Sequence, residues 1–388
     1  MLPFSAIYFF IILAVFIGIV YVFRISALKK IRFSHLLLSL SALYLIFYFP
    51  KPWHIAAFVA YAYGVHLLFI HILKLKHKLP GVIMLLLPLI FIKAGIKISV
   101  YPFRLSDFIS FAGVSYISFR IISVFVDTRA DSKIISPVNY INYLLFIPTL
   151  LIGPIDRYSR FNADSESGYR NLTQQRFLEG WKLLVLGVAY KFIGAAAIDR
   201  FWLQMFDPAL KDVSTMAGNM YGYYFYLFFD FAGYSSMAIG AGKMLGFDVP
   251  VNFNKPFIAV NPQDFWRRFH KTLGDWLRDY FFMPFYQYFS RKKTFKKYPL
   301  MRQNISLFLT FVLMGCWNGF EKHYLLSGAI FGLYSVTHNT YVYYSKKKNR
   351  DLIFGQMHPQ LIKFISVFVM FNLAAFAIYI FSGRCPLI

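Results

Sequence analysis

Apolar segments long enough to cross a bilayer recur along the whole chain, and short polar loops separate them. An α-helix needs about 20 predominantly apolar residues to cross the hydrocarbon core. On this basis we expect about eleven spans, at residues 4–23, 35–49, 54–73, 81–98, 106–126, 138–152, 177–197, 218–242, 303–317, 323–344 and 361–382. No hydrophilic stretch is long enough for a separate soluble domain, so residues 1–388 are predicted to form a single membrane domain.

Composition agrees with this pattern. Hydrophobic residues form 58 % of the 388 residues and charged residues 15 %, whereas soluble domains carry about 25 % charged residues. A soluble protein with so many exposed apolar runs would aggregate. The predicted fold class is an all-α, multi-pass membrane protein.

The formal charge of +24 comes largely from short loops between the predicted spans. Loops rich in Lys and Arg face the cytoplasm in most membrane proteins. Their charge fits two interpretations: attraction to anionic lipids, or an acidic protein that docks on this face. No nucleic-acid-binding motif accompanies them, so we expect no nucleic-acid partner. The loops are Arg24–Arg32, Lys74–Lys78, Arg291–Arg302 and Lys346–Arg350.

One polar stretch, Asn261–Gly319, stands out between apolar segments. Asn261 followed by Pro262 is a helix-start signal. On a helix that begins there, four residues spaced four apart form one stripe: Trp266, His270, Gly274 and Arg278. Gly274 suits a place where a substrate or a backbone must approach closely.

The following apolar run, Asn304–Trp317, covers only about 20 Å as a helix, which is short of the roughly 30 Å hydrocarbon core. Because the run begins beside the basic loop at 291–302, we expect Asn318 to lie well inside the membrane or toward its far side. There it could meet groups of the 261–280 helix.

Two further features place polar groups among apolar ones. Asp230 falls within the apolar span at 218–242, where a carboxylate must be paired or protonated. It either orients a partner Arg or hydroxyl beside a reaction centre or makes a packing hydrogen bond between helices. Pro148, Gly153 and Pro154 break a helix just before Asp156. That break is either buried against protein or a cavity, or an ordinary loop at the membrane surface.

The chain resembles the membrane-bound O-acyltransferase (MBOAT) family, and within it the DltB branch of D-alanyl transfer proteins. The resemblance runs from about residue 113 to 324 in the motif-bearing core. The residues that carry it are Gly-Pro-Ile-Asp-Arg at 153–157, Phe-Phe-Asp-Phe-Ala-Gly-Tyr at 228–234, Asn-Phe-Asn-Lys-Pro-Phe at 252–257, Phe-Trp-Arg-Arg-Phe-His at 265–270, Trp-Leu-Arg-Asp-Tyr at 276–280 and Met-Gly-Cys-Trp-Asn-Gly at 314–319.

The resemblance implies a ring of helices with re-entrant or interfacial helices around a central funnel, in the cytoplasmic (inner) cell membrane. It implies transfer of D-alanine from a phosphopantetheine thioester on a small acidic carrier protein, which binds on the cytoplasmic side. The acceptor is a hydroxyl of a teichoic acid or similar envelope polymer outside. The partner on that side is this polymer or an accessory protein. An alginate-type polysaccharide O-acetyltransferase is the alternative. The nine His and two Cys show no metal-ligand spacing, so we expect no metal. The resemblance implies no bound cofactor, because the thioester is carried on the substrate.

The resemblance also suggests roles for individual residues. His270 and Asn318 are the candidate catalytic pair. Arg291, Lys292 and Lys293 are the candidate docking residues for the carrier protein. The candidate substrate-binding and supporting residues are Asp230, Trp266, Arg278, Asp279 and Trp317.

One departure from the family concerns Asn318, because family members carry Trp-His-Gly where this chain has Trp317-Asn318-Gly319. An amide cannot remove the proton of an attacking hydroxyl, although it can donate a hydrogen bond to a carbonyl oxygen. Three explanations compete: an inactivating change, transfer of the base role to His270, or a non-catalytic relative that transports or binds.

Overall fold

The structure is a computed structural model that describes residues 7–25, 31–49, 51–74, 78–93, 99–100, 103–104, 113–349, 351, 353–355 and 357–388. Parts of the predicted spans at 81–98 and 106–126 lie outside these described residues, as do parts of the basic loops at 24–32 and 74–78. The chain divides into two compact units. The first comprises residues 1–189 and 233–251, and the second comprises residues 190–232 and 252–388.

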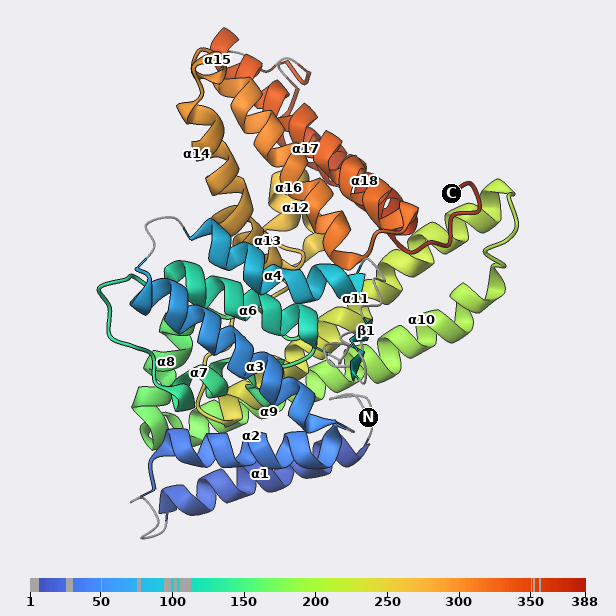
Figure 1. The fold of residues 1–388 in the computed structure, drawn as a ribbon. Helices are drawn as coiled ribbons and strands as arrows, with labels where there is room; N and C mark the ends of the chain where they lie inside the picture. The colour runs from blue at the N-terminus through green and yellow to red at the C-terminus, as the bar shows by residue number, and fades with distance from the viewer. Residues whose placement is uncertain are drawn as a thin grey trace. The chain divides into compact units, whose positions relative to one another are not determined.

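The first unit is built from helices of the N-terminal half (Figure 1). A two-residue antiparallel hairpin, β1 Ser99–Val100 with β2 Phe103–Arg104, is the only sheet in the described residues. Among the helices, α4 packs on α6, and α2 packs on α7 and α8. The helices are α1 Ile7–Ile25, α2 Phe33–Tyr48, α3 Pro52–His66 with its π-helical continuation Leu67–Ile72, α4 Leu79–Lys93, α6 Val114–Asp127, α7 Pro137–Leu144, α8 Tyr158–Ser167 and α9 Gln174–Val188.

The predicted span at 138–152 is wrong. Helix α7 ends at Leu144, and a short 3-10 turn, Ile147–Thr149, follows it. Pro148 cannot donate a backbone hydrogen bond, and its ring disfavours a helical conformation in the residue before it. The chain then continues without helix until α8 begins at Tyr158.

Arg120 of α6 stabilises this irregular segment from inside the unit. Its guanidinium is 2 % exposed, and it donates to the carbonyl oxygens of Tyr143 at 3.0 Å, Leu144 at 3.1 Å and Thr149 at 2.7 Å, and also to the Thr149 hydroxyl. Asp156 is also buried. Non-helical backbone at membrane depth requires partners of this kind. The buried interpretation of the break is therefore the one that the structure supports.

The second unit contains the C-terminal helices and the first part of α11 Val213–Met244. Helices α16 and α17 form a close antiparallel pair, followed by α18 (Figure 1). A Cβ added to Gly328 would lie 2.6 Å from the Phe311 carbonyl oxygen, so this glycine sets the close approach of the pair. The elements are α10 Ala196–Phe201, η7 Pro256–Ile258, α12 Pro262–Trp266, α13 Lys271–Leu277, η8 Arg278–Phe282, α14 Met283–Arg291, α15 Lys293–Lys296, α16 Pro299–Asn318, α17 Lys322–Lys348 and α18 Pro359–Phe381.

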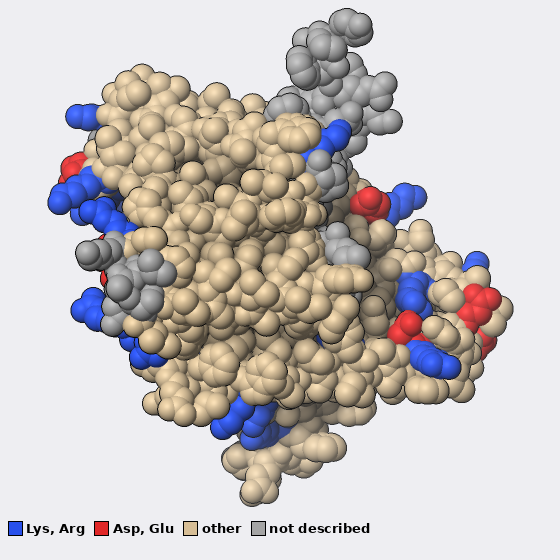
Figure 2. All heavy atoms as spheres, turned by 90° about the horizontal axis from the view of Figure 1, so that it is seen from below, with Lys and Arg blue, Asp and Glu red and all other residues tan. Residues whose placement is uncertain are grey.

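Four stretches of helix among the described residues are long and apolar enough to cross a membrane: Ile7–Ile25, Pro52–Ile72, Gln174–Met205 and Pro359–Phe381. Shorter apolar helices occupy 33–48 and 79–91. Figure 2 shows the Lys, Arg, Asp and Glu side chains of this face in small separate groups, whereas most of the visible atoms belong to other residues. The predicted class, an all-α multi-pass membrane protein, is confirmed. The count of about eleven spans and the ring around a funnel stay predictions.

Candidate active site

The segment predicted to be one continuous helix from Asn261 is broken at His270. Asn261 does cap the start, because its side chain accepts from the Asp264 backbone N–H at 2.8 Å. Helix α12 ends at Trp266, and α13 begins at Lys271. Between them His270 adopts the left-handed conformation, φ 47° and ψ 47°. A helix cannot pass through such a residue, so the predicted four-residue stripe does not form.

The neighbouring chain holds this break in place. The Lys271 N–H donates to the Asn252 carbonyl at 2.9 Å, and the Asn254 N–H donates to the Arg268 carbonyl at 2.8 Å. A left-handed conformation costs a residue with a Cβ on the order of 1–3 kcal/mol, and it persists where the surroundings fix it. Such strain often occurs at functional sites, and here it determines where the imidazole points.

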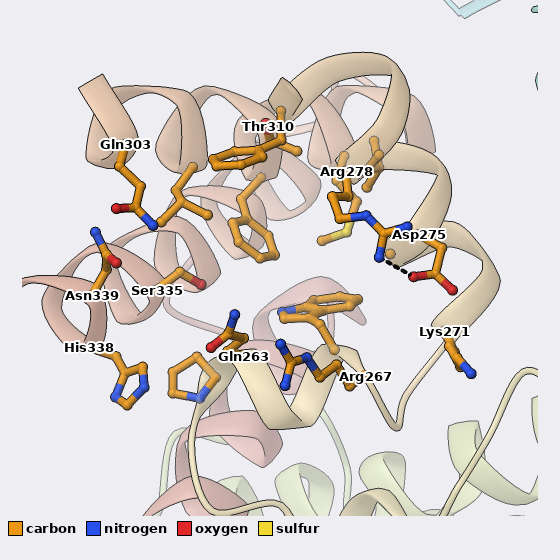
Figure 3. Close-up of a pocket in the computed structure, with 18 of the residues that line it drawn as sticks. Gln263, Arg267, Lys271, Asp275, Arg278, Gln303, Thr310, Ser335, His338 and Asn339 are labelled. Carbon is orange, nitrogen blue, oxygen red and sulfur yellow. Dashed lines mark hydrogen bonds and ion pairs between the residues drawn. The ribbon is translucent and has the colours of Figure 1, made fainter. Parts of the chain in front are cut away.

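Three of the four stripe residues line a pocket of about 310 Å³ within the second unit, namely Trp266, Gly274 and Arg278. Figure 3 shows Gln303 and Asn339 side by side at one end of this pocket and Arg278 with Asp275 at the other. His270 is not among the lining residues. The lining comes from α12, α13, η8 and the facing sides of α16 and α17. It consists of Pro262, Gln263, Trp266, Arg267, Lys271, Gly274, Asp275, Leu277, Arg278, Phe282, Gln303, Leu307, Thr310, Phe311, Met314, Ser335, His338, Asn339 and Val342.

The indole of Trp266 has an unsatisfied polar group at this pocket. Its Nε1 is buried and has no hydrogen-bond partner among the residues that the structure describes, although its ring packs against Phe331 at 4.9 Å between centroids. A buried N–H without an acceptor costs on the order of 1–3 kcal/mol. Gly274 confirms the predicted close approach, since a Cβ there would lie 3.1 Å from the Trp266 carbonyl oxygen.

Three cationic side chains lie at the rim of the pocket. Arg267, Lys271 and Arg278 are exposed at its rim. Arg278 is held by two carboxylates, at 2.8 Å from Asp275 and 2.9 Å from Asp279. These two carboxylates raise the pKa of Arg278, which keeps it a permanent cation. The predicted supporting residues Arg278 and Asp279 are therefore directly paired.

His270 lies against a different surface of the same unit. Its ring meets Phe231 of α11 edge-on, with centroids 4.6 Å apart, and its Nδ1 lies 3.1 Å from Oδ1 of Asn252. Burial lowers the pKa of His270 to about 3. The imidazole is therefore neutral at neutral pH and can accept a proton. Asn252 was not predicted as a site residue, although it begins the Asn-Phe-Asn-Lys-Pro-Phe motif at 252–257.

The C-terminal end of α16 brings two predicted residues close to α13. The Trp317 ring lies 6.3 Å from that of the fully buried Trp276. The Asn318 side chain is exposed and donates to the Met314 carbonyl at 3.0 Å. Met314 lines the pocket, and the Trp317 ring contacts Trp276, whereas the meeting of Asn318 with groups of the 261–280 segment stays a prediction.

Asp230 forms an ion pair with Lys191, a residue that the sequence did not single out. Both residues belong to the second unit, and the pair joins α11 to the π-helical segment Ala189–Ala195. This contact fits the interpretation of Asp230 as a link between helices. It also lies next to Phe231, which contacts His270.

The three predicted docking residues lie where α14 ends and α15 begins. Arg291, Lys292 and Lys293 are all exposed, as are Lys296 and Lys297. Within the described part of the chain, none of these five forms an ion pair. In the same described ranges, no three His, Cys, Asp or Glu side chains gather into a group that could hold a metal ion.

Comparison with known proteins matches residues 18–382 to the model of the membrane-bound O-acyltransferase family. A teichoic acid D-alanyltransferase of Bacillus subtilis (strain 168) is 36 % identical over 287 residues, which cover 72 % of this chain and 70 % of that protein. The corresponding enzyme of Streptococcus thermophilus is 31 % identical, covering 77 % and 74 %. A probable alginate O-acetylase of Pseudomonas aeruginosa is 33 % identical over 240 residues, covering 60 % and 43 %.

Proposed function

The chain belongs to the membrane-bound O-acyltransferase family, and from this membership we propose that it transfers D-alanine from a carrier-protein thioester to a hydroxyl of a teichoic acid or a similar envelope polymer. The reaction takes place at the cytoplasmic membrane. The donor is a substrate, and the enzyme needs no bound cofactor. The pocket of the second unit is the observation that carries this proposal beyond the names of the relatives.

The pocket suits the phosphopantetheine arm of a carrier protein. That arm combines an apolar dimethyl group, two amides and a phosphate. The pocket offers apolar walls at Leu307 and Phe311 and carboxamides at Gln303 and Asn339. The exposed rim cations supply the charge for a phosphate. From Gln303 to Met314 the wall runs about 16 Å along α16, which suits an extended arm.

The cations at the end of α14 and on α15 provide a docking surface for the carrier. Arg291, Lys292 and Lys293 are exposed and form no ion pair within the described residues, although the Lys292 ammonium lies over the Tyr288 ring. Unpaired surface cations raise the association rate with an acidic partner and help to orient it. They lie just before α16, the helix that forms one wall of the pocket.

In the proposed reaction His270, which does not line the pocket, acts as the general base on a thioester that extends beyond the pocket toward the break between α12 and α13. Its Nε2 removes the proton of the acceptor hydroxyl while the hydroxyl oxygen attacks the thioester carbonyl. The tetrahedral intermediate then collapses, the carbon–sulfur bond breaks, and the leaving thiolate takes the proton from the imidazolium. Asn318 donates a hydrogen bond to the carbonyl oxygen as negative charge develops on it.

The test measures D-alanyl transfer from loaded carrier in membranes that contain the present chain, Asn318→His or His270→Ala. We expect transfer by the present chain and a loss of about 10²–10⁴ in rate for His270→Ala. Transfer by Asn318→His alone would mean that position 318 supplies the base and that the present chain is silenced. If none of the three proteins transfers D-alanine while carrier binding is retained, a non-catalytic protein that transports or binds would be favoured.

Acetyl transfer to a polysaccharide is the second candidate, and the similarity to alginate O-acetylases supports it. The same membranes, supplied with acetyl-loaded and D-alanyl-loaded carrier in separate reactions, distinguish the two. Faster use of the acetyl donor would replace D-alanine in the proposal. The described geometry of the pocket is compatible with both donors because they share the same arm.

A further inference from the structure

The side-chain oxygen of Asn252 collects three contacts. It accepts from the Thr272 backbone N–H at 3.2 Å and from the Thr272 hydroxyl at 2.9 Å, and it lies 3.1 Å from Nδ1 of His270. Asn252 is fully buried. The Asn252 backbone carbonyl accepts from the Lys271 N–H at 2.9 Å, so both the backbone and the side chain of Asn252 bond to the break between α12 and α13.

These contacts determine which imidazole nitrogen carries the hydrogen. A backbone N–H can only donate, so the Asn252 atom that faces Thr272 N–H must be the carbonyl oxygen and not the amide nitrogen. The same oxygen faces Nδ1 of His270, and an amide oxygen has no hydrogen to give. Nδ1 must therefore be the donor, and the lone pair of the neutral ring is on Nε2.

We propose that Asn252 is a positioning residue for acyl transfer, which fixes the His270 tautomer whose Nε2 accepts the proton of the acceptor hydroxyl. Thr272 holds the carboxamide in the orientation that this requires. The inference rests on the proposed function, in which Nε2 is the base. Burial lowers the pKa of His270, and no charged neighbour among the described residues contributes, so the ring stays neutral and Asn252 has only its tautomer to determine.

The tautomer can be observed without any turnover. Carbon–nitrogen correlation NMR of histidine-labelled full-length protein in bilayers distinguishes a hydrogen on Nδ1 from one on Nε2. The His270 signals are identified by their loss in His270→Gln. We expect a neutral ring with its hydrogen on Nδ1 in the unsubstituted chain, and an increased share of the other tautomer in Asn252→Leu, which has similar size but no acceptor.

Transfer rates test whether the tautomer matters for the chemistry. Asn252→Leu should slow transfer by roughly 10–100-fold, the usual cost of removing a partner that orients a functional His. Asn252→Asp keeps the acceptor and adds a negative charge that favours the imidazolium. It should restore most of the rate and move the acid limb of the pH–rate profile upward by about one pH unit or more. Gln204→Leu and Gln204→Glu, at an exposed carboxamide that bonds to Asp199 and takes no part in the α12–α13 break, should change neither quantity.

Each result bears on a separate claim. A hydrogen on Nε2 in the unsubstituted chain overturns the inference, and so does a transfer rate that Asn252→Leu leaves unchanged. Equal losses in Asn252→Leu and Asn252→Asp, with no shift of the pH profile, reduce Asn252 to a structural role. If no variant transfers an acyl group while the NMR still shows hydrogen on Nδ1, the proposed function fails and the Asn252 geometry stands.

Discussion

Replacing Arg120 with Met should unfold the irregular segment that follows α7. The guanidinium makes four hydrogen bonds to three residues of that segment, and three of its acceptors are backbone carbonyls. Methionine is apolar and of comparable length, so it keeps most of the packing but removes every donor. Each hydrogen bond to a charged group contributes about 1.5–3 kcal/mol, and water that enters would recover part of this sum. We expect a net loss of about 3–5 kcal/mol in the free energy of unfolding.

The measurement is thermal unfolding of the purified protein in detergent, followed by tryptophan fluorescence. The matched control is Arg129→Met in the same unit. The Arg129 side chain is 82 % exposed, so its replacement should change the free energy of unfolding by no more than about 0.5 kcal/mol. Arg120→Lys should fall between the two because a single ammonium cannot reach four acceptors. Equal unfolding temperatures for Arg120→Met and Arg129→Met would refute the role given to Arg120.

Two predictions concern the donor side of the proposed reaction. Reversing the charge of Arg291, Lys292 and Lys293 together should raise the dissociation constant of the acidic carrier roughly tenfold or more at low salt. The difference in dissociation constant between the present chain and this variant should shrink at high salt. Titration calorimetry at two salt concentrations measures it. Binding that does not depend on salt would contradict a charged docking surface. Trp266→Phe removes a buried indole N–H that has no hydrogen-bond partner in the described part of the chain. It should therefore leave stability unchanged or slightly higher while raising the KM for loaded carrier up to about tenfold, and an unchanged KM would argue against an arm in this pocket.

The helical class and most helix positions could be predicted because the length of each apolar run can be read from the sequence. The prediction failed at 138–152, where apolar composition continues but the backbone does not stay helical. Pro148 indicated a break in the helix. The side chain that stabilises this buried break is Arg120, which lies on a helix far away in the sequence. A contact between residues so far apart in the sequence cannot be recognised from the local sequence pattern. The same holds for Lys191, whose contact with Asp230 joins two helical segments.

The candidate site was predicted in part. Trp266, Gly274 and Arg278 line one pocket, although the helix is broken between Trp266 and Gly274. His270 was placed with them because a continuous helix was assumed. Its positive φ turned it toward Asn252 and Phe231 instead. A non-glycine residue in this conformation cannot be recognised from residue type alone, so sequence periodicity could not separate the pocket from the imidazole.

This conformation allows the chemistry of His270 to be separated from its backbone role. Glycine adopts φ near +47° without strain, so His270→Gly should preserve the break between α12 and α13 and relieve about 1 kcal/mol. The relieved strain offsets part of the cost of removing the imidazole, so His270→Gly should unfold at a higher temperature than His270→Ala, yet transfer should fall equally far in both variants. Glycine also leaves space beside Phe231, where added imidazole can act as a diffusible base. Partial recovery of transfer in His270→Gly with imidazole, but not with an equal concentration of an inert buffer, would assign the base to position 270. No recovery in a variant that folds normally and binds carrier would contradict that assignment and return the question to Asn318.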